Sequence, residues 1–333
     1  MPLNLDILGV KADVACDDPG VLDELSRDFA AFRSTGEAEP EVAVTLTLAS
    51  PPADPLAGAI CRAGRGFRWA EKDGVRRVDY EGRALAVFEA SRERLSVTST
   101  EPELLRELGY LAVCSRAGWR LDMRGFHRLH ALGVERGGKA ALLMLDSGGG
   151  KSSIALELLR RGSARLLSED TPVLGPDGRL HPFALRLGLR PDADLSDITA
   201  TRVRSMARRE HGLKKLVDLD HFPDAVAGAV VPSVLVAGRP GGRRCELRRA
   251  PFATLPPLFT GMVIGLGLPQ LAEFLWPRGA SGWAGLAAVA ARRAVAAARL
   301  WSGCRTYEMR LGPDPARSAA VLAELLDSSE KLG

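Results

Sequence analysis

Hydrophobic and polar positions in the first third of the chain alternate in short runs, which is typical of strands. The run at 42–48, VAVTLTL, has the alternation of a half-buried strand, and residues 5–16 alternate enough for another. The pairs Asp73-Gly74 and Glu81-Gly82 supply the left-handed turn residues that hairpins need, so a meander is predicted. Its strands are expected at residues 67–70, 75–80, 84–89 and 95–98. Helical spacing of apolar residues predicts helices over 20–32 and 101–117.

The pattern changes near Gly125, where longer apolar runs begin to alternate with helical segments. Residues 134–145 predict a hairpin that turns at 136–138 and ends in the buried strand AALLML. A glycine run, a helix over 152–161 and a strand over 165–167 follow, and this order is typical of a phosphate-binding unit. Further strands are expected at 173–174, 179–181, 231–237, 245–248 and 305–311, with a last helix at 315–326. We therefore expect an α+β domain over residues 1–124, acting as a scaffold or in acceptor recognition, and an α/β domain over 125–333.

Composition narrows the class of protein. With 333 residues, 46% of them hydrophobic, the chain can build full cores, which excludes global disorder and a disulfide-stapled miniprotein. The formal charge is 45 − 41 = +4, and the basic residues lack interleaved aromatics, so no nucleic-acid partner is expected. Five cysteines are scattered without a CxxC pair, which supports neither a zinc site nor a disulfide framework. No signal peptide or membrane span is evident, so a cytoplasmic protein is predicted.

The segment 145–153, LDSGGGKSS, is the most informative part of the sequence. Apart from Leu145 at its first position, it fits the phosphate-loop (Walker A) pattern GxxxxGK[ST]. Glycines let backbone amides turn toward an anion, and the helix that follows adds its positive N-terminal dipole. The residues predicted to bind the nucleotide are Ser147, Gly148, Gly149, Gly150, Lys151, Ser152 and Ser153. The alternative is a glycine loop that begins a helix and binds no ligand.

Two adjacent acids, Glu169 and Asp170, end the strand after this helix. Near a phosphate site, a carboxylate can hold Mg²⁺ or orient a nucleophile. The alternative is a polar strand end before Pro172. Because neighbouring strand residues point to opposite faces, only one of the two acids is expected to face the phosphates. His127 is expected at the surface.

Several spacings together carry a family resemblance. His130 precedes Lys151 by 21 residues, 155–162 ends a helix with Arg161-Gly162, and 165–170 reads RLLSED. With the loop itself and the tail at 307–317, these motifs resemble the catalytic core of HPr serine kinase/phosphorylase and its divergent relatives in the phosphoenolpyruvate-carboxykinase-like P-loop group. The resemblance implies an α/β P-loop kinase domain of HPr-kinase type with a mixed sheet. It also implies ATP and Mg²⁺ as cofactors, and it allows a homo-oligomer.

Roles follow from the resemblance residue by residue. Asp170 would be the base that takes the acceptor's hydroxyl proton, with Glu169 as the first acid of the pair and His130 beside both. Lys151 would bind the β/γ-phosphates, and Ser152 and Asp170 would be metal ligands. The stretch 181–191 lacks the glutamate of the family signature, so an acceptor other than HPr is expected, a Ser or Thr of a protein or peptide. Candidates for the missing acid are Asp192, Asp194 and Asp197.

Basic residues beyond the acid pair suggest a clamp for phosphates or for an acidic acceptor. The substrate candidates are Arg186, Arg190, Lys214 and Lys215. The alternative for the basic segment 201–215 is a solvated loop or helix face. Residues 240–244 are expected to form a hairpin turn, and Trp276, Trp283 and Trp301 to anchor a core or an interface.

Two other functions remain open at this point. One is a nucleotide-binding regulator that has lost transfer activity, favoured by Leu145 and the missing glutamate. The other is a small-molecule kinase.

Overall fold

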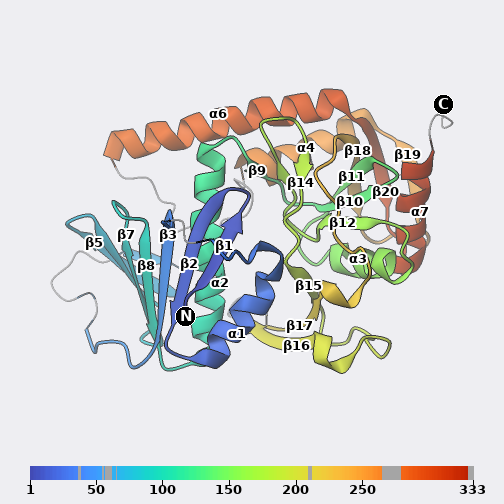
Figure 1. Ribbon diagram of the computed structural model, residues 1–333. Coiled ribbons are helices and arrows are strands. Elements are labelled where there is room, and N and C mark those ends of the chain that lie inside the picture. Colours follow the sequence, from blue (N-terminus) through green and yellow to red (C-terminus); the bar gives the residue numbers. More distant parts are fainter. Residues whose placement is uncertain are drawn as a thin grey trace. The chain divides into compact units, whose positions relative to one another are not determined.

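The computed structural model describes residues 1–36, 39–54, 56, 62–64, 66–208, 212–264 and 279–328 (Figure 1). The chain divides into two compact units. Unit 1 contains Met1–Leu121 and Ser205–Lys214, and unit 2 contains Asp122–Arg204 together with most of the later residues. Each unit combines helices with a sheet of mixed parallel and antiparallel strands, so the fold is mixed α/β. Trp276 and Arg209 lie outside the described residues.

Unit 1 is built on an eight-stranded sheet. Its strand order is β1-β2-β3-β8-β7-β6-β5-β4. The strands are β1 (Leu3–Ile7), β2 (Val10–Cys16), β3 (Val42–Leu48), β4 (Arg62–Gly64), β5 (Phe67–Lys72), β6 (Val75–Asp79), β7 (Ala84–Glu89) and β8 (Arg94–Ser99). The predicted meander is confirmed, and both turn pairs adopt positive φ, with Asp73 at 53° and Glu81 at 56°.

The predicted single strand over 5–16 is wrong. Two strands, β1 and β2, pair antiparallel around Leu8 and Gly9, which have φ values of 51° and 85°. Left-handed conformation at both central residues is what a tight two-residue hairpin requires. Apolar alternation continues through the turn, which is why the pattern suggested one strand.

Two helices pack in unit 1. Helix α1 (Pro19–Asp28) ends four residues before the predicted limit, and residues Ala30–Phe32 form a 3₁₀ turn. Helix α2 (Pro102–Met123) extends beyond the predicted residue 117. A Cβ on Gly109 would come within 2.6 Å of Leu46, so glycine lets α2 approach strand β3 closely.

Unit 2 is built on a six-stranded sheet of order β12-β10-β11-β18-β20-β19. The strands are β10 (Leu132–Arg136), β11 (Lys139–Met144), β12 (Arg165–Ser168), β18 (Pro232–Arg239), β19 (Glu246–Arg249) and β20 (Arg305–Arg310). Strands β11, β18 and β20 run parallel, and the other pairs are antiparallel. The predicted hairpin at 136–138 is confirmed, with Gly137 and Gly138 both at positive φ.

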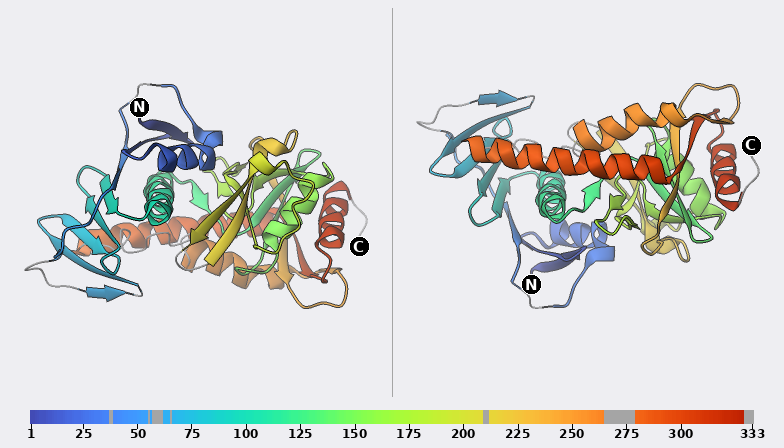
Figure 2. Two further views of the ribbon diagram at one scale, coloured as in Figure 1. Left: turned by 90° about the horizontal axis from the view of Figure 1, so that it is seen from below. Right: turned by 90° about the horizontal axis from the view of Figure 1, so that it is seen from above.

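Helices cover both faces of this sheet. Helix α3 (Lys151–Arg160) and helix α7 (Pro315–Asp327) share a core with Ala141 and Leu143 of β11. On the other face, residues of α4 (Leu255–Phe259) and α6 (Gly279–Gly303) pack with Leu142 and Met144. Alternate residues of β11 thus face opposite layers. In Figure 1, α3 lies below these strands and α6 above them, and α6 is in front when unit 2 is viewed from above (Figure 2).

Two small sheets complete the described chain. One has the order β14-β13-β9, with β9 (His127–Arg128), β13 (Val173–Leu174) and β14 (Leu180–His181). The other has the order β15-β17-β16, with β15 (Arg186–Leu189), β16 (Val203–Arg208) and β17 (Gly212–Asp218). The expectation of a solvated loop or helix face for 201–215 is therefore wrong. Arg204 is buried and forms a hydrogen-bonded ion pair with Asp218.

The expected hairpin turn at 240–244 is also wrong. Strands β18 and β19 do not pair with each other, because β20 lies between them and pairs with both. The segment therefore connects two strands that flank a third. Trp283 is 52% exposed rather than a core anchor, and the half-buried Trp301 donates its indole N–H to the carbonyl of Pro251 at 3.0 Å.

Candidate functional site

The glycine loop connects β11 to α3, as the strand–loop–helix order predicts. Gly148 and Gly150 have φ values of 78° and 103°, and a Cβ at either position would meet open space. The amide of Gly149 donates to the carbonyl of Asp146 at 3.0 Å, which closes the turn. Gly150 is the N-cap of α3 and offers no side chain to the first amides of the helix. Amides at the start of a helix, together with the helix dipole, favour an anion in general.

Leu145, the departure from the motif, has a packing role. It is 4% exposed, and a Cβ on Gly238 of β18 would come within 2.5 Å of its side chain. Leu145 therefore fills the core beneath the loop. The turn itself begins at Asp146.

Lys151 directs its buried side chain back to the loop. Its ammonium donates to the carbonyl of Leu145 at 2.7 Å and lies 2.9 Å from Nε2 of His130 and 3.2 Å from Oδ1 of Asp170. Because an ammonium only donates, Nε2 of His130 is the acceptor, and the ring proton is assigned to Nδ1. That nitrogen lies 3.3 Å from Oδ1 of Asp170. The side chains of His130 and Lys151, which are 21 residues apart, thus both contact the carboxylate of Asp170.

Glu169 has different partners. Its carboxylate accepts a short hydrogen bond from the Ser152 hydroxyl and a second one, at 3.0 Å, from the amide of Gly188 in β15. Glu169 therefore ties the first turn of α3 to β15. The carboxylate beside Ser152 is that of Glu169, whereas Ser152 and Asp170 were expected to be the metal ligands.

Both acids contact the start of α3, Asp170 at Lys151 and Glu169 at Ser152. That only one of them faces bound phosphates stays a prediction. Strand β12 ends at Ser168, before either acid. The alternation of a strand does not extend beyond that point, and the two side chains reach different residues, Lys151 and Ser152.

The two carboxyl groups differ in acidity. Burial and, to a smaller extent, the charge of Asp170 raise the pKa of Glu169 to about 6, because the opposing effects of the donors Ser152 and Gly188 and of the Lys151 charge are smaller. Burial also acts to raise the pKa of Asp170, but the contact with His130 and the charge of Lys151 outweigh it, so this pKa lies below its usual range. Asp170 is thus held as an ionised carboxylate.

Magnesium fits this set of donors. Mg²⁺ takes oxygen ligands and is usually held by one or two carboxylates, with water and substrate phosphates completing its shell. The hydroxyl of Ser152 and the carboxylate of Glu169 are in direct contact, so an ion bound by both oxygens would take the place of this hydrogen bond while the hydroxyl keeps its proton. Within the described residues, no group of three or more His, Cys, Asp or Glu side chains is arranged to hold a metal ion.

The other predicted residues have varied surroundings. Ser147 is exposed in the loop, and Ser153 is half-buried in α3. Arg186 is buried in β15, opposite Asp218 of β17. Arg190 is exposed and pairs with Asp192, and Lys215 donates to the carbonyl of Ala193 at 3.2 Å. Lys214 lies in β17, in the part of that strand that belongs to unit 1.

The candidates for a second metal-associated acid lie elsewhere. Asp197 accepts from Nε of Arg160 at 2.8 Å, and Asp192 pairs with Arg190. Asp194 accepts from the amide of Ser196 at 3.0 Å. These local contacts account for the three carboxylates.

Two groups at the site were not identified in the sequence. The amide of Gly188 and the carbonyl of Leu145 are backbone atoms, so residue type carries no signal for them. His127 was expected at the surface, but it is buried and its Nδ1 lies 3.0 Å from Oδ1 of Asp122. The two-residue strand β9, which holds His127, is too short to produce a periodic pattern.

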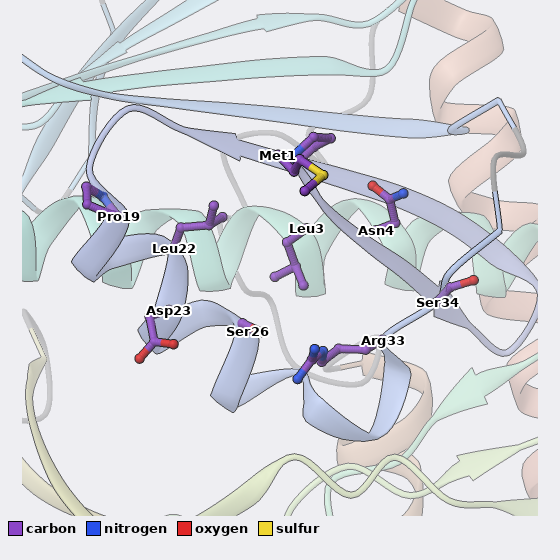
Figure 3. Close-up of a pocket in the computed structure, with 10 residues that line it drawn as sticks. Met1, Leu3, Asn4, Pro19, Leu22, Asp23, Ser26, Arg33 and Ser34 are labelled. Carbon is purple, nitrogen blue, oxygen red and sulfur yellow. The ribbon is translucent and has the colours of Figure 1, made fainter.

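A pocket in unit 1 is separate from this set of residues. It lies beside β1 and α1 and is lined by Leu3, Asn4, Leu22, Ser26 and Arg33, among others (Figure 3). None of the predicted site residues lines it.

No protein-family model and no curated protein matches the sequence. Among solved structures, the chain is similar to the Hpr(Ser) kinase/phosphatase from Coxiella burnetii, with 13% sequence identity and a TM-score of 0.26. The match covers 60% of this chain and 87% of that chain. A TM-score this low assigns neither fold nor activity, so the description as mixed α/β rests on the sheets above. Among the described helices, none combines the length and the apolar character needed to cross a bilayer.

Proposed function

We propose that the protein is an ATP- and Mg²⁺-dependent kinase of HPr-kinase type that transfers the γ-phosphate to a hydroxyl, a Ser or Thr of a protein or peptide. One observation carries the proposal. At a glycine loop that begins a helix, a lysine contacts a histidine and one carboxylate, and the next residue, a serine, contacts a second carboxylate. Phosphoryl transfer needs mainly positioning and charge neutralisation, and this set of groups can supply both.

The loop would hold the triphosphate. Backbone amides from 147 to 152 and the uncapped start of α3 favour an anion. Lys151 would add its charge to the β/γ-phosphates, and the positive φ of Gly148 and Gly150 explains why larger residues do not suit these positions.

Ser152 and Glu169 would hold the magnesium ion. When bound, Mg²⁺ neutralises charge on the phosphates. In this arrangement Glu169 and Asp170 divide two tasks, because only Glu169 contacts Ser152 and only Asp170 contacts Lys151.

Asp170 would act as the base. It accepts the proton of the acceptor hydroxyl, whose oxygen forms the new bond to the γ-phosphorus while the bond to the ADP oxygen breaks. Its lowered pKa keeps the carboxylate ionised, so it carries no proton before the acceptor hydroxyl arrives. His130, with its proton on Nδ1 toward Asp170, would keep the carboxylate in place.

A nucleotide-binding regulator without transfer activity is the second candidate. The contacts of Lys151 favour it, because the ammonium is already engaged by the Leu145 carbonyl, His130 and Asp170. The kinase is preferred since these same contacts bring a base and a phosphate-binding cation together.

Transfer of labelled phosphate distinguishes the candidates. Wild-type protein and Asp170→Asn are incubated with radiolabelled ATP, Mg²⁺ and proteins encoded by neighbouring genes, and products are identified by intact mass. A gain of one phosphate on a protein, lost in Asp170→Asn, would support the protein kinase. ATP binding with no transfer by either form would favour the regulator, and turnover with a metabolite alone would favour a small-molecule kinase.

A further inference from the structure

A buried polar cluster in unit 2 has no part in the proposed chemistry. It consists of Asp122, His127 and Arg293, which we call the arginine clip. Arg293 of α6 has no exposed surface, and its Nε and Nη2 donate to the two oxygens of Asp122 at 3.0 and 2.7 Å. Nη1 donates to two backbone carbonyls, those of Arg128 at 3.1 Å and Met262 at 2.8 Å. The clip thus joins segments near residues 122, 128, 262 and 293.

The chemistry of the clip suggests a geometric role. A buried ion pair adds little to the free energy of unfolding, because the cost of removing both charges from water offsets much of their attraction. A guanidinium is nevertheless rigid and planar, so its donors fix the relative positions of every acceptor that they reach. Four of the five N–H groups of Arg293 have partners in this cluster. Arg293 therefore sets where the two carbonyls lie.

Those two carbonyls belong to the two segments whose backbone contact holds His130. The amide of His130, which is two residues after Arg128, donates to the carbonyl of Gly261 at 3.4 Å. Gly261 in turn directly precedes Met262. A Cβ on Gly261 would stand 3.5 Å from the Cβ of His130, so the two segments are in direct contact. The next amide, of Ala131, donates to the carbonyl of Asp170 at 3.2 Å.

We propose that Arg293 is a positioning residue of the phosphate site, which acts through His130. By holding the carbonyls of Arg128 and Met262, it fixes the backbone from which the imidazole reaches Lys151 at 2.9 Å and Asp170 at 3.3 Å. A small shift of that backbone would break both contacts. The expected effect on catalysis rests on the proposed kinase function, whereas the anchoring of the backbone by Arg293 does not.

A double-mutant cycle tests the route through His130. Arg293→Lys keeps the charge but loses the planar fork, and we expect kcat to fall about tenfold, as misplacement of reacting groups does. In a His130→Ala background, Arg293→Lys should lower kcat less than twofold further. Losses that multiply in the double variant, or a wild-type kcat in Arg293→Lys, would overturn the proposal.

A matched control separates positioning from general stability. Arg116 and Glu93 form another buried arginine fork, with two contacts of 2.8 Å. Arg116→Lys should lower the melting temperature but change kcat less than twofold. An equal loss of kcat in both lysine variants would refute a specific role for Arg293.

Hydrogen exchange tests the anchoring without any enzymatic readout. In protein without added nucleotide, amides at 128–132 should exchange at least tenfold faster in Arg293→Lys, and at the wild-type rate in Arg116→Lys. Unchanged exchange would refute the anchoring, whether or not the protein transfers phosphate. Absence of transfer by the wild type together with faster exchange would instead reject only the kinase. If Arg293→Lys fails to fold, Asp122→Leu/Arg293→Met replaces the pair by apolar side chains and should show the same faster exchange.

Discussion

The ammonium of Lys151 lies 3.2 Å from Oδ1 of Asp170. The residue proposed to bind phosphate and the residue proposed to accept a proton therefore hold each other. An ammonium has three N–H donors, and the Leu145 carbonyl, His130 and Asp170 already engage them. Binding of a β/γ-phosphate by Lys151 would have to replace at least one of these contacts. If the contact replaced is the one with Asp170, nucleotide binding would release that carboxylate.

Lys151→Met should weaken ATP binding at least tenfold, because the loop loses its only side-chain cation while the loop backbone is kept. Isothermal titration calorimetry with ATP and Mg²⁺ measures the affinity. Lys139→Met is the control, since Lys139 in β11 donates to the carbonyl of Leu326 rather than to the loop. An affinity for ATP in Lys151→Met equal to that of the control would remove the site assignment.

Substitutions of Asp170 and Glu169 should change different kinetic parameters. Asp170→Asn should lower kcat by about 10²-fold or more, with the affinity for ATP changed less than threefold, because a general base contributes to the transition state. Glu169→Gln should mainly raise the Mg²⁺ concentration required for half-maximal rate, because it removes one anionic ligand beside Ser152. Steady-state kinetics over a Mg²⁺ series separates the two. Identical Mg²⁺ profiles for both variants would contradict the division of roles.

The free energy of unfolding should change with pH because Glu169 titrates. Its pKa is about 6 in the folded state against 4.5 ordinarily. Below pH 4.5 the carboxyl is protonated in both folded and unfolded chains, so its contribution is fully present there. That contribution is lost as pH rises through 6, by on the order of 2 kcal/mol.

The amide introduced by Glu169→Gln does not titrate, so this variant should not lose that part of the unfolding free energy as pH rises. Relative to wild type, the variant should gain stability between pH 4.5 and 7. Urea unfolding without added Mg²⁺ at both pH values gives the comparison. A wild type and variant whose unfolding free energies change in parallel with pH would show that the pKa is not raised.

Restoring the first glycine of the loop motif should not improve binding. Leu145→Gly removes a buried side chain that packs on Gly238, so we expect a loss of about 3–5 kcal/mol of stability. The affinity for ATP should change less than threefold, because the turn begins at Asp146. Val231→Ala, at a 57% exposed position, should cost less than about 0.5 kcal/mol and serves as the control. Tighter ATP binding by Leu145→Gly would mean that Leu145 weakens the site.

Much of the secondary structure was predictable because it depends on local pattern. The glycine spacing around Lys151 and the alternation before it predicted the strand, loop and helix that position the site, and helix α3 begins at Lys151. The turns at Asp73 and Glu81 followed from residues that tolerate left-handed backbone. Each of these features is set by neighbours in the sequence.

The rest depends on contacts between distant residues. Nothing local places the amide of Gly188 at Glu169, 19 residues away, or Arg293 at Asp122, 171 residues away. The order of strands is likewise a long-range property, which is why 240–244 was mistaken for a hairpin turn. Positions that need a distant partner are the ones that periodicity cannot predict.

The place of β20 in the sheet has a consequence for how the protein is made. This strand, Arg305–Arg310, pairs with β18 on one side and β19 on the other. A ribosome must therefore release the chain through residue 310 before the sheet that carries the glycine loop can close. Until then the nascent polypeptide exposes unpaired edges of β18 and β19, and a stop codon shortly before residue 305 would leave a product prone to aggregation instead of a smaller working domain.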